Sequence, residues 1–189
     1  MMQLFEALEN RRSIRAYRPD PVPRELLDRM MYAASLSPSA LNEQPWHFYV
    51  ATGQARQGIG EIMLQGTHYL EEYMTVLGHE MNEHVLQWYS ELGGAPVIIV
   101  CTSPRTDDEF MRMNKHLSMG GATQSMLLAA TELGLGACNL TFSFWVRDEI
   151  AQLLGVPEDR VVVALVAVGY PAEEPASHPR NTDIAVYLD

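Results

Sequence analysis

The chain has 189 residues, a formal net charge of -11 and an isoelectric point near 4.9. A chain of this length can bury a large core without disulfides or metals, so we expect a single domain over residues 1–189. The acidic balance argues against nucleic acid or an anionic membrane as a partner, and the longest apolar runs fall short of the roughly 18 residues of a membrane span.

Positive charge is concentrated near the N-terminus, where four of the twelve arginines lie between Arg11 and Arg18. Residues 3–10 have apolar side chains at helical spacing and are predicted to form a short helix that ends at this cluster. Arg11 and Arg15 lie on the same side of the backbone in a strand or in a helix. Two guanidinium groups on one side suit a phosphate or another compact anion. A solvated basic turn is the alternative.

Prolines mark a second helix and a polar loop. Pro23 suits the first turn of a helix, and Pro38 follows just beyond the end of its apolar pattern. Residues 37–46 then form a loop rich in turn residues, followed by a predicted strand over residues 47–51. Such a loop can carry binding groups or simply join a helix to a strand.

Residues 54–92 have a mostly helical pattern with a Met- and Tyr-rich middle that can line an adaptable pocket. His79 and His84 resemble a zinc-binding helix motif, but they are five residues apart, about 140° from a common helix face. We therefore expect no metal site.

The second half of the chain alternates apolar strands with helices. Residues 96–102 and 161–168 are continuous apolar runs, predicted as strands buried on both faces. A long helix is predicted over residues 107–133, a strand over residues 137–142 and a short helix over residues 147–154.

Three smaller features complete the pattern. Gly120 and Gly121 lie inside the long helix, where each costs about 1 kcal/mol relative to alanine, so the pair suggests helix packing, another backbone or a flat ligand. Cys101 and Cys138 lie in apolar runs without metal-binding spacing, which predicts buried reduced thiols. Reduced thiols and the lack of a signal-peptide pattern together predict a cytoplasmic location. Residues 184–188 can add a strand to a sheet edge, their own or a partner's.

Taken in order, these segments resemble the FMN-dependent nitroreductase family. The motifs are R-R-S-I-R after a short helix, S-P-S-A-L-N-E-Q-P-W before a strand, A-P-V-I-I-V, a long helix ending G-L-G, and G-Y-P followed by a basic residue near the end. The resemblance spans nearly the whole chain. It implies an α+β fold, with a mainly antiparallel sheet flanked by helices and a long central helix. It also implies a homodimer with one tightly bound FMN in each of two interfacial sites and a domain-swapped C-terminal tail.

Carried over by position, the resemblance assigns residues to the FMN site. The phosphate, the ribityl chain and the N1/C2 edge of the ring would be held by Arg11, Arg12, Ser13 and Arg15, with Arg180 near the phosphate. The other subunit would supply Pro38, Ser39, Ala40 and Asn42. Beside flavin N5 would pass Asn139, Leu140, Thr141 and Phe142. Arg15 and the Thr141 backbone are the catalytic candidates, although many members have Glu-Gly or another small pair at Thr141-Phe142.

The resemblance implies an oxidoreductase in which NADH or NADPH passes hydride to flavin N5. An electron-poor acceptor, such as a nitroaromatic, a quinone or an activated alkene, then receives it. The flavin supplies this chemistry, so no Ser-His-Asp or Cys-His set is required. Two alternatives stay open: a non-catalytic flavin-binding sensor or carrier, and a divergent reaction such as dehalogenation.

Overall fold

The protein is described by a computed structural model that covers residues 3–70 and 87–188. The rejected metal motif at His79 and His84 lies outside the described residues.

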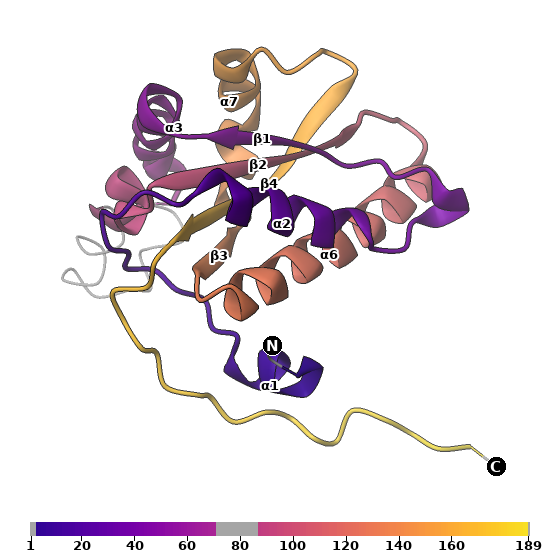
Figure 1. Cartoon of the computed structure of the whole chain (residues 1–189). Helices are drawn as coiled ribbons and strands as arrows, with labels where there is room; N and C mark the ends of the chain where they lie inside the picture. The colour runs from indigo at the N-terminus through magenta and orange to yellow at the C-terminus, as the bar shows by residue number, and fades with distance from the viewer. Residues whose placement is uncertain (1–2, 71–86, 189) are drawn as a thin grey trace.

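Four antiparallel strands form one sheet in the order β1-β2-β4-β3 (Figure 1). β1 (His47–Ala51) pairs with β2 (Val97–Pro104), β2 pairs with β4 (Arg160–Gly169), and β4 pairs with β3 (Gly136–Leu140). The two central strands are rich in β-branched residues and are buried along most of their length. This confirms the prediction drawn from their continuous apolar runs.

Helices cover both faces of the sheet (Figure 1). α2 (Arg24–Ser35) and α6 (Glu109–Glu132) lie on one face, and α3 (Gly53–Gly66) and α7 (Arg147–Leu154) lie on the other. Successive residues of β2 point to opposite faces, so Ile98 packs in the core with α3 and α7, whereas Ile99 packs in the core with α2 and α6. The predicted α+β class, with an antiparallel sheet and a long central helix, is therefore confirmed.

Shorter elements join these layers. α1 (Leu4–Asn10) precedes the arginine segment and contacts α6. In the described part of the chain, the 3-10 helices are η1 (Ala40–Asn42), η2 (Thr67–Leu70), η3 (Leu92–Gly94) and η4 (Phe142–Val146).

Two predicted boundaries differ from the structure for local reasons. The strand predicted over residues 137–142 ends at Leu140, because Thr141 has helical dihedral angles, φ -100° and ψ -10°, and leads into η4. The long helix begins at Glu109, because the Asp108 carboxylate accepts a hydrogen bond from the Met111 N–H at 2.8 Å and so caps the helix.

The C-terminal tail leaves the sheet after β4 and runs past α1 (Figure 1). The Ala172 N–H donates to the Ala16 carbonyl at 2.9 Å, and the described residues beyond it form neither helix nor strand. Val186 and Tyr187 are 84% and 91% exposed. The tail therefore adds no strand to its own sheet, and its exchange with a partner stays a prediction.

Across residues 3–70 and 87–188, no helix is long and apolar enough to cross a membrane. The same residues contain no cluster of three or more metal-binding side chains.

Candidate functional site

The arginine segment lies beside β3, an edge strand of the sheet. Ser13 forms a parallel bridge with Ala137, and the Ile14 N–H donates to the Ala137 carbonyl at 3.2 Å. Gly136 permits this approach, because a Cβ at that position would lie 2.8 Å from three atoms of the Ile14 side chain. The segment is therefore extended here, and its side chains line the edge of β3.

Other parts of the chain fix the backbone at Arg15. Its carbonyl accepts a hydrogen bond from Trp88 Nε1 at 2.6 Å, and Gly93, with a φ of 63°, approaches it too closely to leave room for a Cβ. The Glu173 carboxylate accepts hydrogen bonds from the Arg15 N–H and, at 3.1 Å, from the Ala16 N–H. The Arg15 side chain is exposed, donates from Nη1 to the Ser13 carbonyl at 3.4 Å and forms no ion pair within the described residues.

The Cys138 thiol lies where several polar side chains converge. Burial raises the pKa of this thiol, and Glu173 adds to the increase. Arg15, Ser13 and Arg11 oppose the increase, because two cations and a hydroxyl favour the thiolate. Ser13 therefore lies beside this thiol, and the charges of Arg11 and Arg15 act on it through space.

Two mostly buried tyrosines lie near Cys138. Burial raises the pKa of both Tyr17 and Tyr89, and Cys138 adds to the increase. The Tyr17 hydroxyl donates to the Ile14 carbonyl at 2.5 Å, and the Tyr89 ring packs against Phe142 with centroids 4.6 Å apart. Both phenols therefore stay neutral near pH 7 and pack against the surrounding residues.

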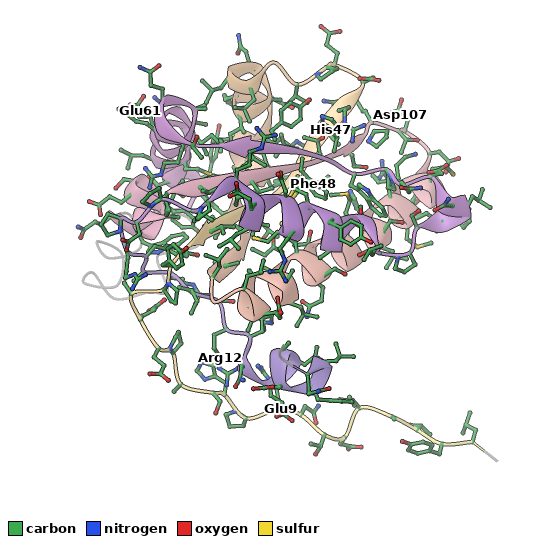
Figure 2. All side chains as sticks on the ribbon, viewed as in Figure 1. Glu9, Arg12, His47, Phe48, Glu61 and Asp107 are labelled. Atoms are coloured by element: carbon green, nitrogen blue, oxygen red, sulfur yellow. The ribbon has the colours of Figure 1, made fainter. Side chains whose placement is uncertain are left out.

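Arg12 carries a buried donor without an acceptor. Its Nη1 donates to the Glu9 carbonyl at 2.5 Å and to the Arg11 carbonyl at 2.9 Å, and Figure 2 shows Arg12 beside Glu9. Its Nε is buried and has no hydrogen-bond partner among the described residues. A buried unsatisfied donor costs about 1–3 kcal/mol. An acceptor from a bound ligand would remove that cost.

The loop between α2 and β1 is held against α6. Ser37 Oγ lies 2.8 Å from Ser125 Oγ, and the Ala40 N–H points to Ser118 Oγ at 3.4 Å. Within the loop, Ser39 Oγ accepts a hydrogen bond from the Gln44 N–H at 3.0 Å. Positive φ angles at Leu41, Asn42 and Gln44 make a tight turn, and Leu41 projects from it, 94% exposed. These hydrogen bonds hold the loop in one conformation against α6.

Arg160 of β4 anchors the end of this loop to the sheet. Its guanidinium donates to the Pro45 carbonyl at 2.7 Å, to the Thr102 carbonyl at 2.9 Å and to Thr102 Oγ1 at 3.0 Å. Thr102 in turn donates from Oγ1 to the His47 carbonyl at 2.9 Å. Burial lowers the pKa of Arg160, and the nearby Tyr49 and Asp159 oppose the decrease.

The structure does not bring all of the assigned residues together within one chain. No hydrogen bond or ion pair in the described residues joins the loop residues Pro38, Ser39, Ala40 and Asn42 to the arginine segment. Arg180 lies in the exposed tail, where the described residues provide no ion-pair partner. The segment that carries Arg11, Ser13 and Arg15 pairs with β3, which also carries Asn139 and Leu140.

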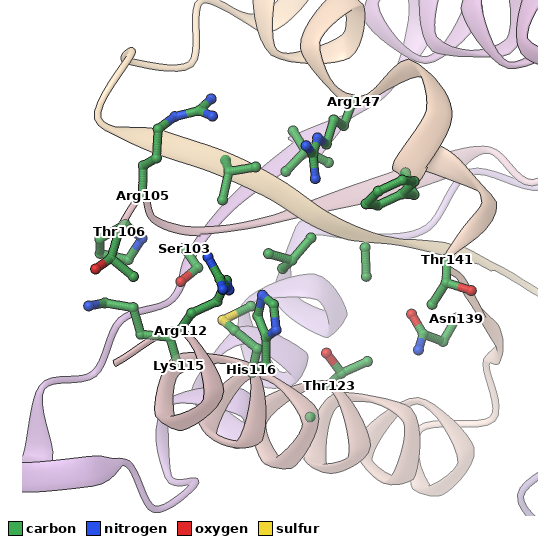
Figure 3. Close-up of a pocket in the computed structure, with 18 of the residues that line it drawn as sticks. Ser103, Arg105, Thr106, Arg112, Lys115, His116, Thr123, Asn139, Thr141 and Arg147 are labelled. Atoms are coloured by element: carbon green, nitrogen blue, oxygen red, sulfur yellow. The ribbon is translucent and has the colours of Figure 1, made fainter. Parts of the chain in front are cut away.

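A cavity of about 530 Å³ opens between α6 and the ends of the strands (Figure 3). Asn139 and Thr141 line one end, and the other end is lined by the basic side chains Arg105, Arg112, Lys115 and His116. Between them the wall includes buried Met119 and Val162. The arginine segment therefore meets β3 near its start, at Ala137, and the cavity meets β3 near its end, at Asn139.

Comparison with known proteins gives the class of this molecule. The model of the nitroreductase family matches residues 8–170, so the chain belongs to that family. An NADH dehydrogenase of Thermus thermophilus is 32% identical over 176 residues, which cover 87% of this chain and 84% of that protein. An iodotyrosine deiodinase of Thermotoga neapolitana is 25% identical over 190 residues, which cover 99% of this chain and 98% of that protein.

The fold is similar to solved structures over its full length. The crystal structure of the FMN and NADPH-dependent nitroreductase NfnB from Sphigopyxis sp. strain HMH superposes with a TM-score of 0.83 at 22% identity and covers 100% of both chains.

Sequence reasoning missed several residues that build the site. Glu173, Trp88 and Cys138 come from three distant parts of the chain, and nothing in their local pattern connects them with Arg15. The basic end of the cavity did carry a signal, because Arg112, Lys115 and His116 are three and four residues apart on one predicted helix.

Proposed function

We propose that the protein is an FMN-dependent NAD(P)H oxidoreductase that reduces small electron-poor acceptors such as nitroaromatics, quinones or activated alkenes. The observation that carries this proposal is the pairing of the arginine segment with β3 through Ser13 and Ala137, together with the buried free donor of Arg12. The NADH dehydrogenase and the FMN and NADPH-dependent nitroreductase among the similar proteins support the same cofactor and donor.

The residues at this point fit the anionic and polar parts of FMN. Arg12 Nε needs an acceptor, and within the described residues the guanidinium of Arg11 has no hydrogen-bond or ion-pair partner. The Arg15 and Ala16 N–H groups already donate to Glu173, so the contacts to a ligand come from side chains. We assign Arg11, Arg12 and Ser13 to the phosphate and ribityl chain, and Arg180 of the tail to the phosphate.

When bound, FMN supplies hydride acceptance and hydride donation at N5. The protein orients the ring and adjusts its electrostatic environment. Arg15 is assigned to the N1/C2 edge, where a fixed cation stabilises negative charge. The turn at Thr141, with Asn139, Leu140 and Phe142, is assigned to the N5 side, where backbone groups can orient the ring and the substrate.

We further propose that the protein acts as a homodimer with FMN at the interface. Within the described residues, no hydrogen bond or ion pair joins the loop residues Pro38, Ser39, Ala40 and Asn42 to the arginine segment of their own chain, and in this assignment they reach the partner's FMN. Exposed apolar side chains support an interface, since Phe5, Leu41, Leu117 and Val186 are 74%, 94%, 69% and 84% exposed. The apolar tail is assigned to the partner's surface.

The site and its cofactor form one FMN-binding domain over residues 1–189 in this proposal. The cytoplasm is the proposed location, supported by two free, buried cysteines that suit a reducing compartment.

A dehalogenase activity is the second candidate. The iodotyrosine deiodinase that covers nearly the whole chain supports it, as does Thr141-Phe142 in place of a small N5-side pair. A flavin-binding sensor or carrier would keep the same anion site without turnover.

Anaerobic reduction of the FMN-reconstituted protein tests the proposal. We expect NADH or NADPH to bleach the flavin absorbance, and a nitroaromatic or a quinone to restore it within one turnover. Bound flavin that neither nicotinamide reduces would favour a sensor or carrier. A protein that remains without flavin absorbance after addition of FMN would refute the assignment of the site.

A further inference from the structure

The cavity between α6 and the sheet gathers basic side chains in a chain that is acidic as a whole. Five basic side chains line it, Arg105, Arg112, Lys115, His116 and Arg147, against one acidic side chain, Asp107. The whole chain has 13 lysines and arginines against 24 acidic residues. Cations gathered in one concave place focus a positive potential there, which attracts anions from solution.

Within the described part of the chain, two of these cations have no hydrogen-bond or ion-pair partner. Arg105 donates to the Glu158 carbonyl at 3.2 Å and lies 3.8 Å from the Asp148 carboxylate. By contrast, no hydrogen bond or ion pair occupies the side-chain charge of Arg112 or Lys115 within residues 3–70 and 87–188. They are three residues apart on α6, close enough to repel each other. An anion between them would relieve this repulsion.

The cavity is polar at both ends and apolar between them. Thr123, Asn139 and Thr141 line the end near β3, opposite the basic side chains (Figure 3). Gly120 keeps the α6 wall open, because no atom lies within 4 Å of the place where its Cβ would be. A ring with an anionic group at one end matches this arrangement.

We propose that this cavity binds a substrate through a carboxylate or phosphate group, held by Arg112 and Lys115, with its ring directed toward Thr141. The inference rests on the proposed function and narrows it to anionic substrates. The cavity is separate from the arginine segment, since Figure 2 shows Asp107, at the cavity's basic end, far from Arg12. The anionic group can belong to the acceptor, as a carboxylate, or to the donor, as the additional phosphate of NADPH.

A double variant that replaces two cavity cations with neutral amides tests the inference against a matched control. Arg112→Gln/Lys115→Gln removes two charges from the cavity, and Arg24→Gln/Arg29→Gln removes two charges from α2. The FMN-reconstituted proteins are compared with para-nitrobenzoate and para-nitrobenzamide, which share ring and nitro group and differ in charge. NADPH and NADH form the second pair of compared substrates, because they differ in the additional phosphate.

We expect the cavity variant to raise KM for para-nitrobenzoate about ten- to a hundredfold, the loss that corresponds to one charge-assisted hydrogen bond. KM for the neutral amide should change less than about twofold, and the α2 variant should behave as the wild type. A KM increase confined to NADPH would support the inference with the donor phosphate as the anion. Equal changes for charged and neutral substrates, or no change, would overturn it.

Binding without turnover separates this inference from the proposed function. Calorimetric titration of oxidised, FMN-loaded protein with para-nitrobenzoate and with NADPH needs no hydride transfer. If either ligand binds more weakly to the cavity variant but not to the α2 variant, the cavity is supported as an anion site. This holds even if neither nicotinamide reduces the flavin. If each ligand has the same dissociation constant in both variants, the cavity is refuted as the anion site. Flavin reduction by NADH or NADPH would still support the proposed function.

Discussion

Removal of the Arg160 guanidinium should loosen the loop between α2 and β1. Arg160→Met keeps the aliphatic stem and deletes three donors to Pro45 and Thr102, with bonds of 2.7 to 3.0 Å. Hydrogen bonds to a charged group contribute about 1.5–3 kcal/mol each, but desolvation of the guanidinium, which lowers its pKa, offsets part of the sum. We therefore expect a net loss of about 2–4 kcal/mol.

Urea unfolding followed by circular dichroism measures this loss, and Arg105→Met is the matched control. Arg105 also donates to carbonyls at this end of the sheet, but its side chain is 51% exposed and, within the described residues, forms no hydrogen bond to the loop. Its loss should stay below about 1 kcal/mol. Because the loop is assigned to the partner's FMN, Arg160→Met should also weaken FMN binding. Equal unfolding free energies for the two variants would refute the conclusion that Arg160 stabilises the loop.

Three further predictions test the site and its support. Arg11→Ala should weaken FMN binding about ten- to a hundredfold while turnover at saturating FMN survives, and unchanged affinity by flavin fluorescence would place the phosphate elsewhere. Gly136→Ala should destabilise the fold by about 1–3 kcal/mol in urea, because its Cβ meets Ile14 at 2.8 Å. A stability equal to wild type would mean that the arginine segment does not depend on this contact. Burial raises the pKa of Cys101 to about 12, so its contribution to stability is complete below pH 9, where the unfolded thiol begins to ionise, and falls as pH rises toward 12. From pH 8 to 10 wild type should lose about 1.4 kcal/mol more than Cys101→Ala, and parallel pH curves would contradict this.

The sequence alone determined the elements and the class of fold. Apolar runs over residues 96–102 and 161–168 predicted the central strands, because the period of side-chain burial is a local property of the backbone. Ordered motifs indicated the nitroreductase family, and the family model over residues 8–170 agrees. The boundary at Leu140 was missed because Thr141 follows the turn into η4, which an extended apolar pattern does not reveal.

The contacts that build the site depended on tertiary structure. Glu173 reaches the Arg15 N–H from 158 positions away, and Arg160 reaches the Pro45 carbonyl from 115 positions away. The cavity likewise needs α6, β2, β4 and the turn after β3 to meet. Pairings at such separations leave no periodic signal in the chain, because they follow from how the sheet and helices pack and not from local spacing. The sequence could therefore predict which arginines cluster, whereas only the packed fold decided what holds them and which cations are left free.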